Sequence, residues 1–349
     1  MKISIGTKLK DGPWGGGNLF AINLGTYLED KGYKVVNNLL DDDIDIILIT
    51  EPRRTSESSA FTHIDVQRYL KYTKADTLVG HRLNECDERK NTKYVNKYLI
   101  EANKTADFSI FVSQWLKSLY LDQGIGVKEK HVIYAGANKE IFNNIGFTYW
   151  DKKEKLKLVT HHWGANWNKG FAIYKKLDEL LEDKTWKDKL EFMYIGNLPK
   201  GFTFNNVNVV DPLSGKELAN KVKENHLYIT GSLFEPSGNH HIEAAQCGLP
   251  ILYLNSGGTP EYCKDYGLLF NENNIKEKIV QIMNDYDKYV EKVKKYPFNS
   301  DIMCSNYEDL FIEMYNKKEE ILASRTLELK NNFIEKIYYQ YKKKNMKNE

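Results

Sequence analysis

The chain has 349 residues, of which 41% are hydrophobic and 28% are charged, and its formal net charge at pH 7 is +2. This length and apolar content predict about two folded domains and exclude an intrinsically disordered chain. The near-neutral charge argues against a nucleic-acid partner. No apolar run approaches the ~18 residues that span a bilayer. The first ten residues contain no apolar signal core, so we expect a cytoplasmic protein.

Short apolar segments alternate with segments of helical periodicity along the whole chain. The run Ile46–Ile49 is apolar at every position, as is typical of strands buried on both faces of a parallel sheet. Glycine or asparagine marks several boundaries, with Asn18 a predicted N-cap and Gly32 a predicted helix stop. The predicted strands are Lys2–Ile5, Lys34–Val36, Ile44–Thr50, Thr77–Val79, Phe108–Val112, Val132–Tyr134, Leu156–Thr160, Leu190–Ile195, Val207–Val210, His226–Thr230 and Pro250–Leu254. The predicted helices are Asn18–Leu28, Thr92–Thr105, 169–182, 215–224, 239–247 and 275–295.

This alternation predicts an α/β protein with two doubly wound, Rossmann-like domains facing a cleft. The periodicity is lost over residues 143–155, which are polar, so we place a domain boundary there. The predicted domains are 1–145 and 146–304. Residues 305–349 are expected to form helices that pack back on the N-terminal domain.

The C-terminal segment ends in a basic cluster. It contains Lys342, Lys343, Lys344 and Lys347 in a helical pattern. Two interpretations stay open: a peripheral contact with an anionic membrane, on its inner face, or a solvated helix end whose cations suit the helix dipole.

Two segments are candidates for binding a phosphate and a sugar. Gly15, Gly16 and Gly17 lie between the first strand and the first helix, where glycines allow a ligand to approach a helix N-terminus closely. They do not form the G-x-G-x-x-G fingerprint of dinucleotide-binding proteins, and a plain surface turn has the same composition. Further on, Glu235 and Glu243 are separated by seven residues at a strand-to-helix junction.

The second segment suits a sugar phosphate. Carboxylates accept hydrogen bonds from sugar hydroxyls, and the backbone amides of Gly238, Asn239 and His240 can hold an anion at the helix N-terminus. The competing interpretation is an exposed acid followed by an acid that stabilises a helix start.

The surrounding residues resemble a known family. The stretch 235–250, EPSGNHHIEAAQCGLP, followed by GGTPE at 257–261, resembles the E-x7-E signature of the retaining GT-B-fold glycosyltransferases, the glycosyl transferases group 1 family. The resemblance covers the C-terminal half well. It extends more loosely to the N-terminal half through Gly15–Gly17, residues 111–116 and residues 132–142.

The resemblance implies roles for individual residues. Glu243 would hold the ribose hydroxyls, Glu235 the transferred sugar, and Lys169 the diphosphate. His81, just after a predicted strand, resembles the family's donor-contacting histidine. The resemblance thus implies the catalytic residues His81, Glu235 and Lys169 and the donor-binding residues Gly16, Gly17, Asn166, Gly238, Asn239, His240 and Glu243. On the acceptor side, Arg53, Arg82 and Asn84 are candidates because they follow strands; for these, and for His81, a charged surface loop is the alternative.

The sequence departs from the family at the diphosphate clamp. The family has an Arg and a Lys in a GR…KG segment, whereas residues 163–170 read WGANWNKG. Lys169 and Gly170 are kept, but Gly164 stands where the Arg is expected. His161, His162 or Asn166 are candidate substitutes. In the segment that follows His81, Asp87 and Arg89 are interpreted as members of structural ion pairs.

No metal site is predicted. The run Asp41–Asp45 contains a D-x-D pattern, but it precedes a strand and is best explained as a solvated turn. His161 and His162 lack a third ligand at suitable spacing, and the four cysteines fit no zinc pattern and are expected to be reduced thiols. The 23 tyrosines are expected around the rim of the core.

These observations predict a retaining, metal-independent glycosyltransferase that needs no cofactor. It would move a sugar from a nucleotide-sugar donor to a glycan, lipid-linked or other hydroxyl acceptor in polysaccharide or glycoconjugate synthesis. The alternatives are a nucleotide-sugar epimerase or phosphorylase on the same scaffold, and a non-catalytic partner of another glycosyltransferase. A nicotinamide dehydrogenase is disfavoured because the glycine fingerprint fails.

Overall fold

A computed structural model describes residues 1–10, 15–126, 129–327 and 332–347 of the chain. The chain divides into two compact units. Unit 1 comprises Met1–Asp87, Lys93–Ile133 and Cys304–Glu349; unit 2 comprises Glu88–Thr92 and Tyr134–Met303. The chain therefore changes unit between Ile133 and Tyr134, earlier than the boundary expected at residue 145. Within the described segments, no helix is long and apolar enough to cross a bilayer.

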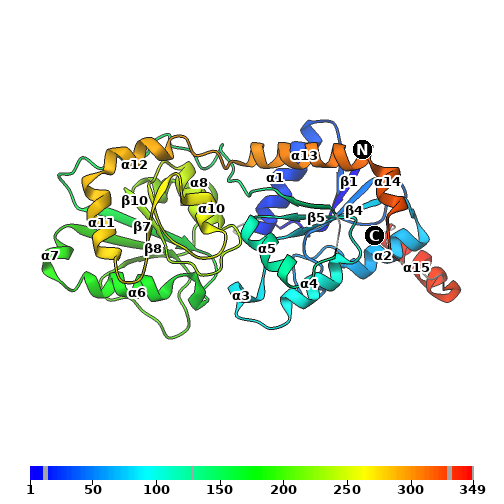
Figure 1. Cartoon of the computed structure of the whole chain (residues 1–349), viewed down its shortest axis with the longest axis horizontal. Helices are drawn as coiled ribbons and strands as arrows, with labels where there is room; N and C mark the ends of the chain where they lie inside the picture. The colour runs from blue at the N-terminus through cyan, green and yellow to red at the C-terminus, as the bar shows by residue number, and fades with distance from the viewer. Residues whose placement is uncertain (11–14, 127–128, 328–331, 348–349) are drawn as a thin grey trace. The chain divides into compact units, whose positions relative to one another are not determined.

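Unit 1 contains a parallel sheet of six described strands in the order β2-β1-β3-β4-β5-β6 (Figure 1). Its strands are β1 (Lys2–Ile5), β2 (Lys34–Val36), β3 (Ile46–Ile49), β4 (Leu78–Leu83), β5 (Phe108–Phe111) and β6 (Glu129–Val132). Its helices are α1 (Gly16–Asp30), α2 (His63–Tyr72), α4 (Val95–Asn103) and α5 (Gln114–Asp122), with the short α3 (Asp87–Lys90) at the junction with unit 2.

Unit 2 repeats this architecture, with its described strands in the order β12-β11-β10-β7-β8-β9. Its strands are β7 (Leu156–His162), β8 (Leu190–Gly196), β9 (Asn208–Val210), β10 (Leu227–Thr230), β11 (Ile251–Leu254) and β12 (Gly267–Phe270). Its helices are the 3-10 turn η1 (Trp167–Lys169), α6 (Phe171–Leu180), α7 (Lys184–Lys187), α8 (Gly215–Lys223), α9 (Asn239–Gln246), α10 (Thr259–Cys263), α11 (Ile275–Asn284) and α12 (Tyr286–Val293).

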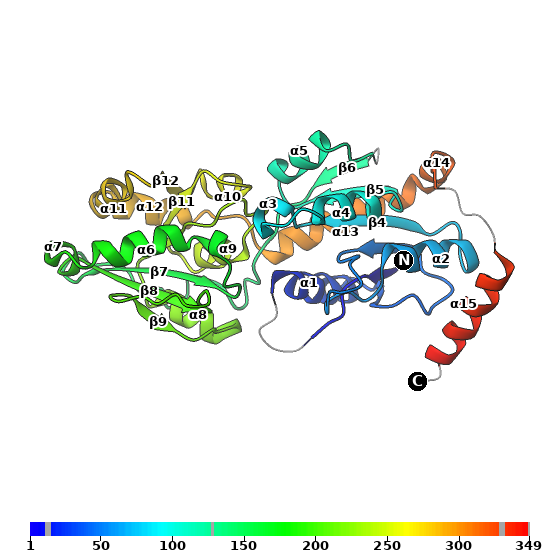
Figure 2. The same cartoon turned by 90° about the horizontal axis from the view of Figure 1, so that it is seen from below.

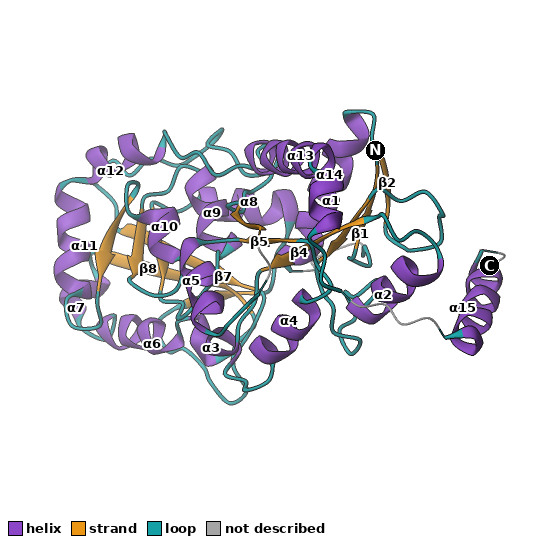
Figure 3. Ribbon diagram, turned by 45° about the vertical axis from the view of Figure 1, so that its right-hand side comes forward, coloured by secondary structure: helices purple, strands orange, loops and turns teal. Residues whose placement is uncertain are grey.

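Alternation of side chains along each strand builds a core on both faces of the second sheet. Leu156 and Leu158 of β7 pack with α6, α11 and α12, whereas Val159 packs with α8, α9 and α10. Figure 3 shows the orange strands enclosed by purple helices. All strand pairs described are parallel, so both units are doubly wound Rossmann-like domains, as the alternation predicted.

The segment that follows unit 2 returns to unit 1. Helix α13 (Ser300–Asn316) begins in unit 2 and continues into unit 1, where Tyr307 packs against Phe20 of α1 with ring centroids 5.1 Å apart. Tyr27 and Tyr33 both donate hydrogen bonds to the Glu308 carboxylate. Two further helices follow, α14 (Lys318–Ala323) and α15 (Phe333–Met346). The C-terminal helices α14 and α15 belong to unit 1.

Several boundaries differ from the sequence predictions. Helix α1 begins at Gly16 with Gly15 as N-cap, because the Asn18 side chain bonds the backbone of Lys10 through both its oxygen and its nitrogen. Gly32 ends the helix as predicted, with φ of +85°. The helix predicted over 275–295 breaks at Asp285 into α11 and α12. Strand β12 and helices α2 and α5 were not predicted. Many tyrosines are core residues rather than rim residues, since Tyr69, Tyr120, Tyr174, Tyr194, Tyr228, Tyr262, Tyr286 and Tyr307 are among the largest fully buried side chains. Others are exposed, namely Tyr94, Tyr149, Tyr315, Tyr338 and Tyr341.

A buried ion pair attaches the returning segment to the first sheet. Arg325 donates from Nε and Nη2 to the two carboxylate oxygens of Asp107, at 2.8 and 2.7 Å, and also binds the carbonyls of Ala75 and Thr77. Asp107 in turn accepts a hydrogen bond from the backbone of Val79 in β4. The Asp107 side chain is only 3% exposed, so its charge depends on this partner.

We therefore predict that Arg325→Ala lowers the free energy of unfolding of unit 1 by about 3 kcal/mol, since it strands a buried carboxylate. Urea unfolding followed by circular dichroism measures the change. Lys317→Ala is the matched control, because the Lys317–Glu313 pair is half exposed and its loss should cost less than about 0.5 kcal/mol. Equal midpoints for the two variants would contradict the assignment.

Candidate functional site

The loop between β10 and α9 carries Glu235 on a constrained backbone. Phe234 has a φ of +53°, and Gly257 and Gly238 have φ values of +63° and +74°. A Cβ at Gly257 would lie 2.5 Å from the backbone nitrogen and oxygen of Glu235, and one at Gly238 would lie 2.5 Å from the His241 ring. The amide of Gly258 donates to the Glu235 carbonyl at 2.8 Å. The paired glycines at 257–258 therefore hold the backbone of Glu235 by close approach.

The Glu235 carboxylate lies between two cations. Lys169 Nζ is 2.7 Å from Glu235 Oε2, and Arg89 Nε is 2.9 Å from Glu235 Oε1. Glu235 and Lys169 are buried, with 6% and 7% of their surface exposed, and the Arg89 side chain is 20% exposed. Burial alone would raise the pKa of Glu235, but the charges of Arg89 and Lys169 outweigh it and hold that pKa well below its usual range. The carboxylate is therefore ionised at neutral pH, and the three groups carry a net charge of about +1.

Asn168 holds the two cation-bearing segments together. Its Nδ2 donates to the carbonyls of Glu88 and Arg89, and its own carbonyl accepts from the amide of Leu233. Residues 88–92 belong to unit 2, although their neighbours on both sides belong to unit 1. The fold thus brings Arg89 to Lys169 across 80 residues of chain.

Glu243 lies on α9, and its carboxylate contacts a histidine of β7. His161 Nε2 is 2.8 Å from Glu243 Oε2, and both side chains are buried. His161 is in turn held by Tyr228, whose hydroxyl accepts from the His161 amide at 3.1 Å. The Glu243 carboxylate is therefore fixed by a hydrogen-bonded chain that runs back into the sheet.

A polar network continues under the site at the carboxyl ends of β7 and β10. The hydroxyl of Tyr174 contacts His162 Nε2 at 2.7 Å and accepts from the amide of Gly231 at 3.2 Å, and Thr230 Oγ1 lies 2.9 Å from His240 Nε2. Burial lowers the pKa of His162 and of His240 well below the usual value, so both rings are neutral at pH 7. His162 and His240 therefore add no charge beside Lys169 and Arg89.

The N-terminus of α9 completes an anion-binding arrangement. Its N-cap is Gly238, which has no side chain to occupy the free amides of the first turn. Those amides and the positive end of the helix dipole lie in the loop that carries Glu235, whose carboxylate bonds Lys169. The site can therefore offer an anion two cations and a helix end, and can offer hydroxyl groups the carboxylates of Glu235 and Glu243.

The structure brings together most of the predicted donor residues. Gly238, Asn239, His240 and Glu243 follow one another along α9 and its N-cap, beside Glu235 and Lys169. Asn166 is the exposed N-cap of η1 and accepts from the Lys169 amide through its carbonyl. A Cβ at Gly164 would lie 3.6 Å from Lys169 Cε, so position 164 directly neighbours the clamp lysine.

The predicted residues of unit 1 occupy different environments. His81 is fully buried in β4, where Nδ1 lies 3.1 Å from Asn103 Nδ2, and burial lowers its pKa to about 3. Arg82 is also buried, with its guanidinium 3.9 Å from the centroid of the Phe20 ring. Neither lies in the exposed loop that the sequence offered as an alternative. Arg82 therefore has a packing contact with Phe20, and its predicted role in binding an acceptor stays a prediction.

The remaining predicted residues lie at strand and helix ends. Arg53 forms a two-pronged pair with Glu51, Nε to Oε1 at 2.8 Å and Nη2 to Oε2 at 2.5 Å. Asn84 is half-buried just after β4, and Gly16 and Gly17 form the half-buried first turn of α1. A Cβ at Gly17 would meet nothing within 4 Å, so close packing does not require glycine there. Their predicted roles stay predictions.

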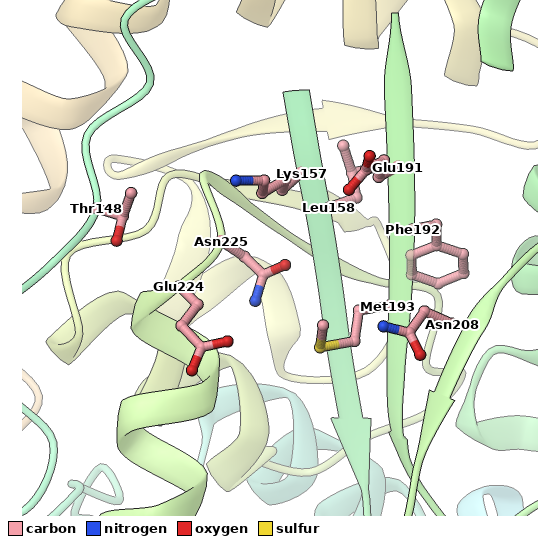
Figure 4. Close-up of a pocket in the computed structure, with 9 residues that line it drawn as sticks. All are labelled: Thr148, Lys157, Leu158, Glu191, Phe192, Met193, Asn208, Glu224 and Asn225. Carbon is pink, nitrogen blue, oxygen red and sulfur yellow. The ribbon is translucent and has the colours of Figure 1, made fainter. Parts of the chain in front are cut away.

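A pocket of about 350 Å³ opens elsewhere on unit 2 (Figure 4). It is lined by Lys157 and Leu158 at the start of β7, by Glu191 and Phe192 at the start of β8, and by Asn225 before β10. These positions mark the amino ends of the strands. Ligands of doubly wound sheets bind beyond the carboxyl ends, so this pocket is not the candidate site.

Metal ligands do not gather anywhere in the described part of the chain: it holds no group of three or more His, Cys, Asp or Glu side chains suited to an ion. The D-x-D run is paired with lysines, since Asp41 and Asp43 bind Lys2, Asp45 binds Lys74 and Asp42 binds Lys343. The four cysteines are buried free thiols.

Comparison with known proteins agrees with this architecture. Residues 203–298 match the family model described as glycosyl transferases group 1. HepE from Anabaena, solved with UDP and glucose, is 14% identical, with 90% of this chain and 100% of that one covered at a TM-score of 0.63. A glycosyltransferase from Rickettsia africae is 15% identical, with 93% and 99% covered at 0.63. Sucrose-phosphate synthase from Thermosynechococcus elongatus is 14% identical, with 90% and 99% covered at 0.59.

Among curated proteins none matches this chain. The protein has the GT-B fold of two Rossmann-like domains. The segment that matches the glycosyl transferases group 1 model, residues 203–298, includes Glu235, Glu243 and the glycine pair 257–258. The resemblance seen in the sequence is confirmed there.

Sequence reasoning missed four residues of the site. Arg89 was interpreted as a structural pair, and Asn168, Tyr174 and Tyr228 were not singled out. One signal for Arg89 was present in the sequence. Residues 163–170 keep Lys169 but lack the family's arginine, so a second cation could be expected from another segment. The two tyrosines had no signal, because tyrosine is frequent throughout this chain.

The glycine pair gives a prediction about the geometry of Glu235. Gly257→Ala places a Cβ against the backbone of Glu235 at a positive φ, so we expect a loss of stability of about 2–4 kcal/mol. Thermal and urea unfolding measure it. Gly201→Ala is the control: it also has a positive φ, of +77°, but its Cβ meets nothing within 4 Å, so it should cost about 1 kcal/mol. A smaller effect at Gly257 than at Gly201 would refute the packing role.

Proposed function

We propose that this chain is a retaining glycosyltransferase that binds a nucleotide-diphosphate sugar in unit 2 and transfers the sugar to a hydroxyl acceptor. The observation that carries the proposal is the Arg89–Glu235–Lys169 ion set at the N-terminus of α9, with Glu243 further along the same helix. The glycosyl transferases group 1 match over this segment and the HepE structure with UDP and glucose support it.

Each part of the donor has a matching group. The diphosphate is held by Lys169, Arg89 and the amides at the start of α9, because charge-assisted bonds to phosphate are strong in a largely buried site. The ribose hydroxyls bond Glu243, which His161 orients. The transferred sugar bonds Glu235, whose ionised carboxylate accepts from hydroxyl groups once the donor replaces part of its contacts with the two cations.

For the transfer step we propose front-face attack, which the resemblance to retaining GT-B glycosyltransferases implies. The bond between the anomeric carbon and the phosphate oxygen breaks as the acceptor oxygen bonds the same carbon on the same face. The acceptor proton passes to the departing phosphate oxygen. Lys169, Arg89 and the helix end stabilise the negative charge that develops on the leaving diphosphate, so no metal ion is required.

Arg89 takes the place of the arginine that residue 164 lacks. Gly164 has no side chain to offer, yet the Glu235 carboxylate still has a second cation at 2.9 Å. The absence of that arginine was the reason to consider a non-catalytic partner protein, and the position of Arg89 favours a catalytic transferase instead. An epimerase or phosphorylase on this scaffold would form product without a hydroxyl acceptor, so product analysis without acceptor separates these enzymes from a transferase.

The donor site predicts the effect of Glu243→Ala. We expect loss of nucleotide-sugar binding by calorimetry, because the ribose loses its carboxylate. Glu217→Ala is the control, since Glu217 is an exposed acid on α8 and its variant should bind normally. Unchanged affinity in Glu243→Ala would overturn the proposed function.

The donor for this experiment is chosen by a thermal-shift panel of UDP, GDP, ADP, CMP and their sugars, with and without EDTA. A ligand at 100 times its Kd stabilises by about 2.7 kcal/mol, so the cognate nucleotide should stand out. A shift that survives EDTA is expected for a metal-independent site.

Arg89 predicts a second, separable effect. Arg89→Gln should weaken donor binding by about 10- to 100-fold, as for the loss of a charged hydrogen bond. Gly164→Arg in the same chain should restore most of it, because position 164 neighbours Lys169 and its φ accepts any side chain. Lys93→Gln, a nearby exposed cation, is the control. If Arg89→Gln binds the donor normally while Glu243→Ala does not, the role of Arg89 fails and the proposed function stands.

A further inference from the structure

Helix α15 attaches to unit 1 through a polar face. Its contacts with α2 and with the segment before β3 come from residues spaced by four, which share one side of the helix. The docked residues are Glu335, Tyr339, Lys343 and Lys347. Figure 2 shows α15 beside α2 in unit 1.

The docked face is held by ion pairs and hydrogen bonds. Glu335 accepts from Lys71 at 2.8 Å, from Arg68 at 3.1 Å and from the Tyr72 hydroxyl at 2.7 Å. The hydrogen bond from Lys71, followed by those from Tyr72 and Arg68, lowers the pKa of Glu335 to about 2. Lys343 donates to Asp42 at 2.7 Å. The half-buried ring of Tyr339 also contacts the Tyr72 ring, with centroids 5.7 Å apart. The docked side of the helix is therefore mainly polar.

The opposite face is apolar and faces outward. Ile334, Ile337, Tyr338 and Tyr341 recur at the i, i+3, i+4, i+7 spacing of an amphipathic helix and are 79%, 53%, 66% and 65% exposed. Phe333 extends this stripe and is 77% exposed. A helix on a globular domain normally turns such a stripe inward. In α15 the polar side contacts unit 1 and the apolar stripe is exposed, which is typical of a helix face that binds another surface.

Lysines surround the outward stripe. At about 100° per residue, Lys344 falls at one edge of the stripe, between Phe333 and Ile337, and Lys342 borders the other edge beyond Tyr338. Lys342 and Lys344 are both exposed. Lysines and tyrosines beside an apolar helix face suit the interface of a bilayer, where the apolar groups enter the acyl boundary and the ammonium groups meet anionic head groups.

We infer that the outward face of α15, defined by Phe333, Ile334, Ile337, Tyr338 and Tyr341, docks on an anionic membrane surface. Charge complementarity selects this occupant. A second copy of the chain in a two-fold interface would set the same lysines against each other, which costs energy. The inference does not rest on the proposed glycosyltransferase function, but it suits an acceptor that is itself lipid-linked.

Co-sedimentation of the full chain with vesicles tests the inference. We expect binding to vesicles of phosphatidylcholine with about 30% phosphatidylglycerol, little binding to phosphatidylcholine alone, and weaker binding at high salt. Ile334→Ser with Ile337→Ser and Tyr341→Ser should reduce the partition coefficient at least about tenfold. Lys342→Gln with Lys344→Gln should reduce it about fivefold for each lysine.

Matched variants on unit 2 serve as controls. Ile145→Ser removes an isoleucine that is 77% exposed, and Lys187→Gln with Lys189→Gln removes two exposed lysines; both should bind vesicles normally. Equal melting temperatures and equal nucleotide-sugar binding show that the α15 variants remain folded.

Two results would overturn the inference. One is the absence of binding to the anionic vesicles at low salt, or binding that the triple α15 variant leaves unchanged. The other is a concentration-dependent dimer, seen by analytical ultracentrifugation, that the triple variant abolishes while vesicles bind neither form; the face would then pair two copies.

Discussion

The carboxylate of Glu235, held between Lys169 and Arg89, is the interaction on which the candidate site depends. An unpaired charge that is this deeply buried would be costly, so each of the three groups requires the others. They come from separate segments: the loop after β10, the turn η1, and residues 88–92. Contact between these three side chains therefore sets the positions of all three segments. Gly257 adds a fourth, because its approach to the backbone of Glu235 leaves no room for a side chain.

The polar groups beneath these loops give the site its rigidity. Thr160 of β7 donates to the hydroxyl of Tyr174 on α6, which contacts His162. The hydroxyl of Tyr228 in β10 accepts from the amide of His161, the residue that contacts Glu243. Burial keeps His162 and His240 neutral, so they take part in this network without adding charge. Lys169 and Arg89 supply positive charge where a diphosphate would lie in the proposed function.

Local pattern predicted much of the fold and less of the site. The buried strands were recognised because parallel strands have apolar residues on both faces, as Ile46–Ile49 does. Strand β12, with its half-exposed residues, lacked that signal. The break between α11 and α12 at Asp285 was not predicted, because the apolar periodicity continues through it. In the structure Tyr286 points inward at this break and donates to the carbonyl of His226. The N-cap of α1 was wrong because Asn18 bonds the distant backbone of Lys10 instead.

The sequence by itself determined two Rossmann-like halves and the E-x7-E segment with its glycine pair, because strand burial, helix starts and close-packed glycines leave marks within a few residues of each other. Only the tertiary structure decided which cation accompanies Lys169, what orients Glu243, and which side of α15 faces outward. Each of these depends on residues far apart in the chain: Arg89 with Glu235, His161 with Glu243, and Lys71 with Glu335. Spacing along a sequence cannot record such pairs, since folding alone sets the distance between them.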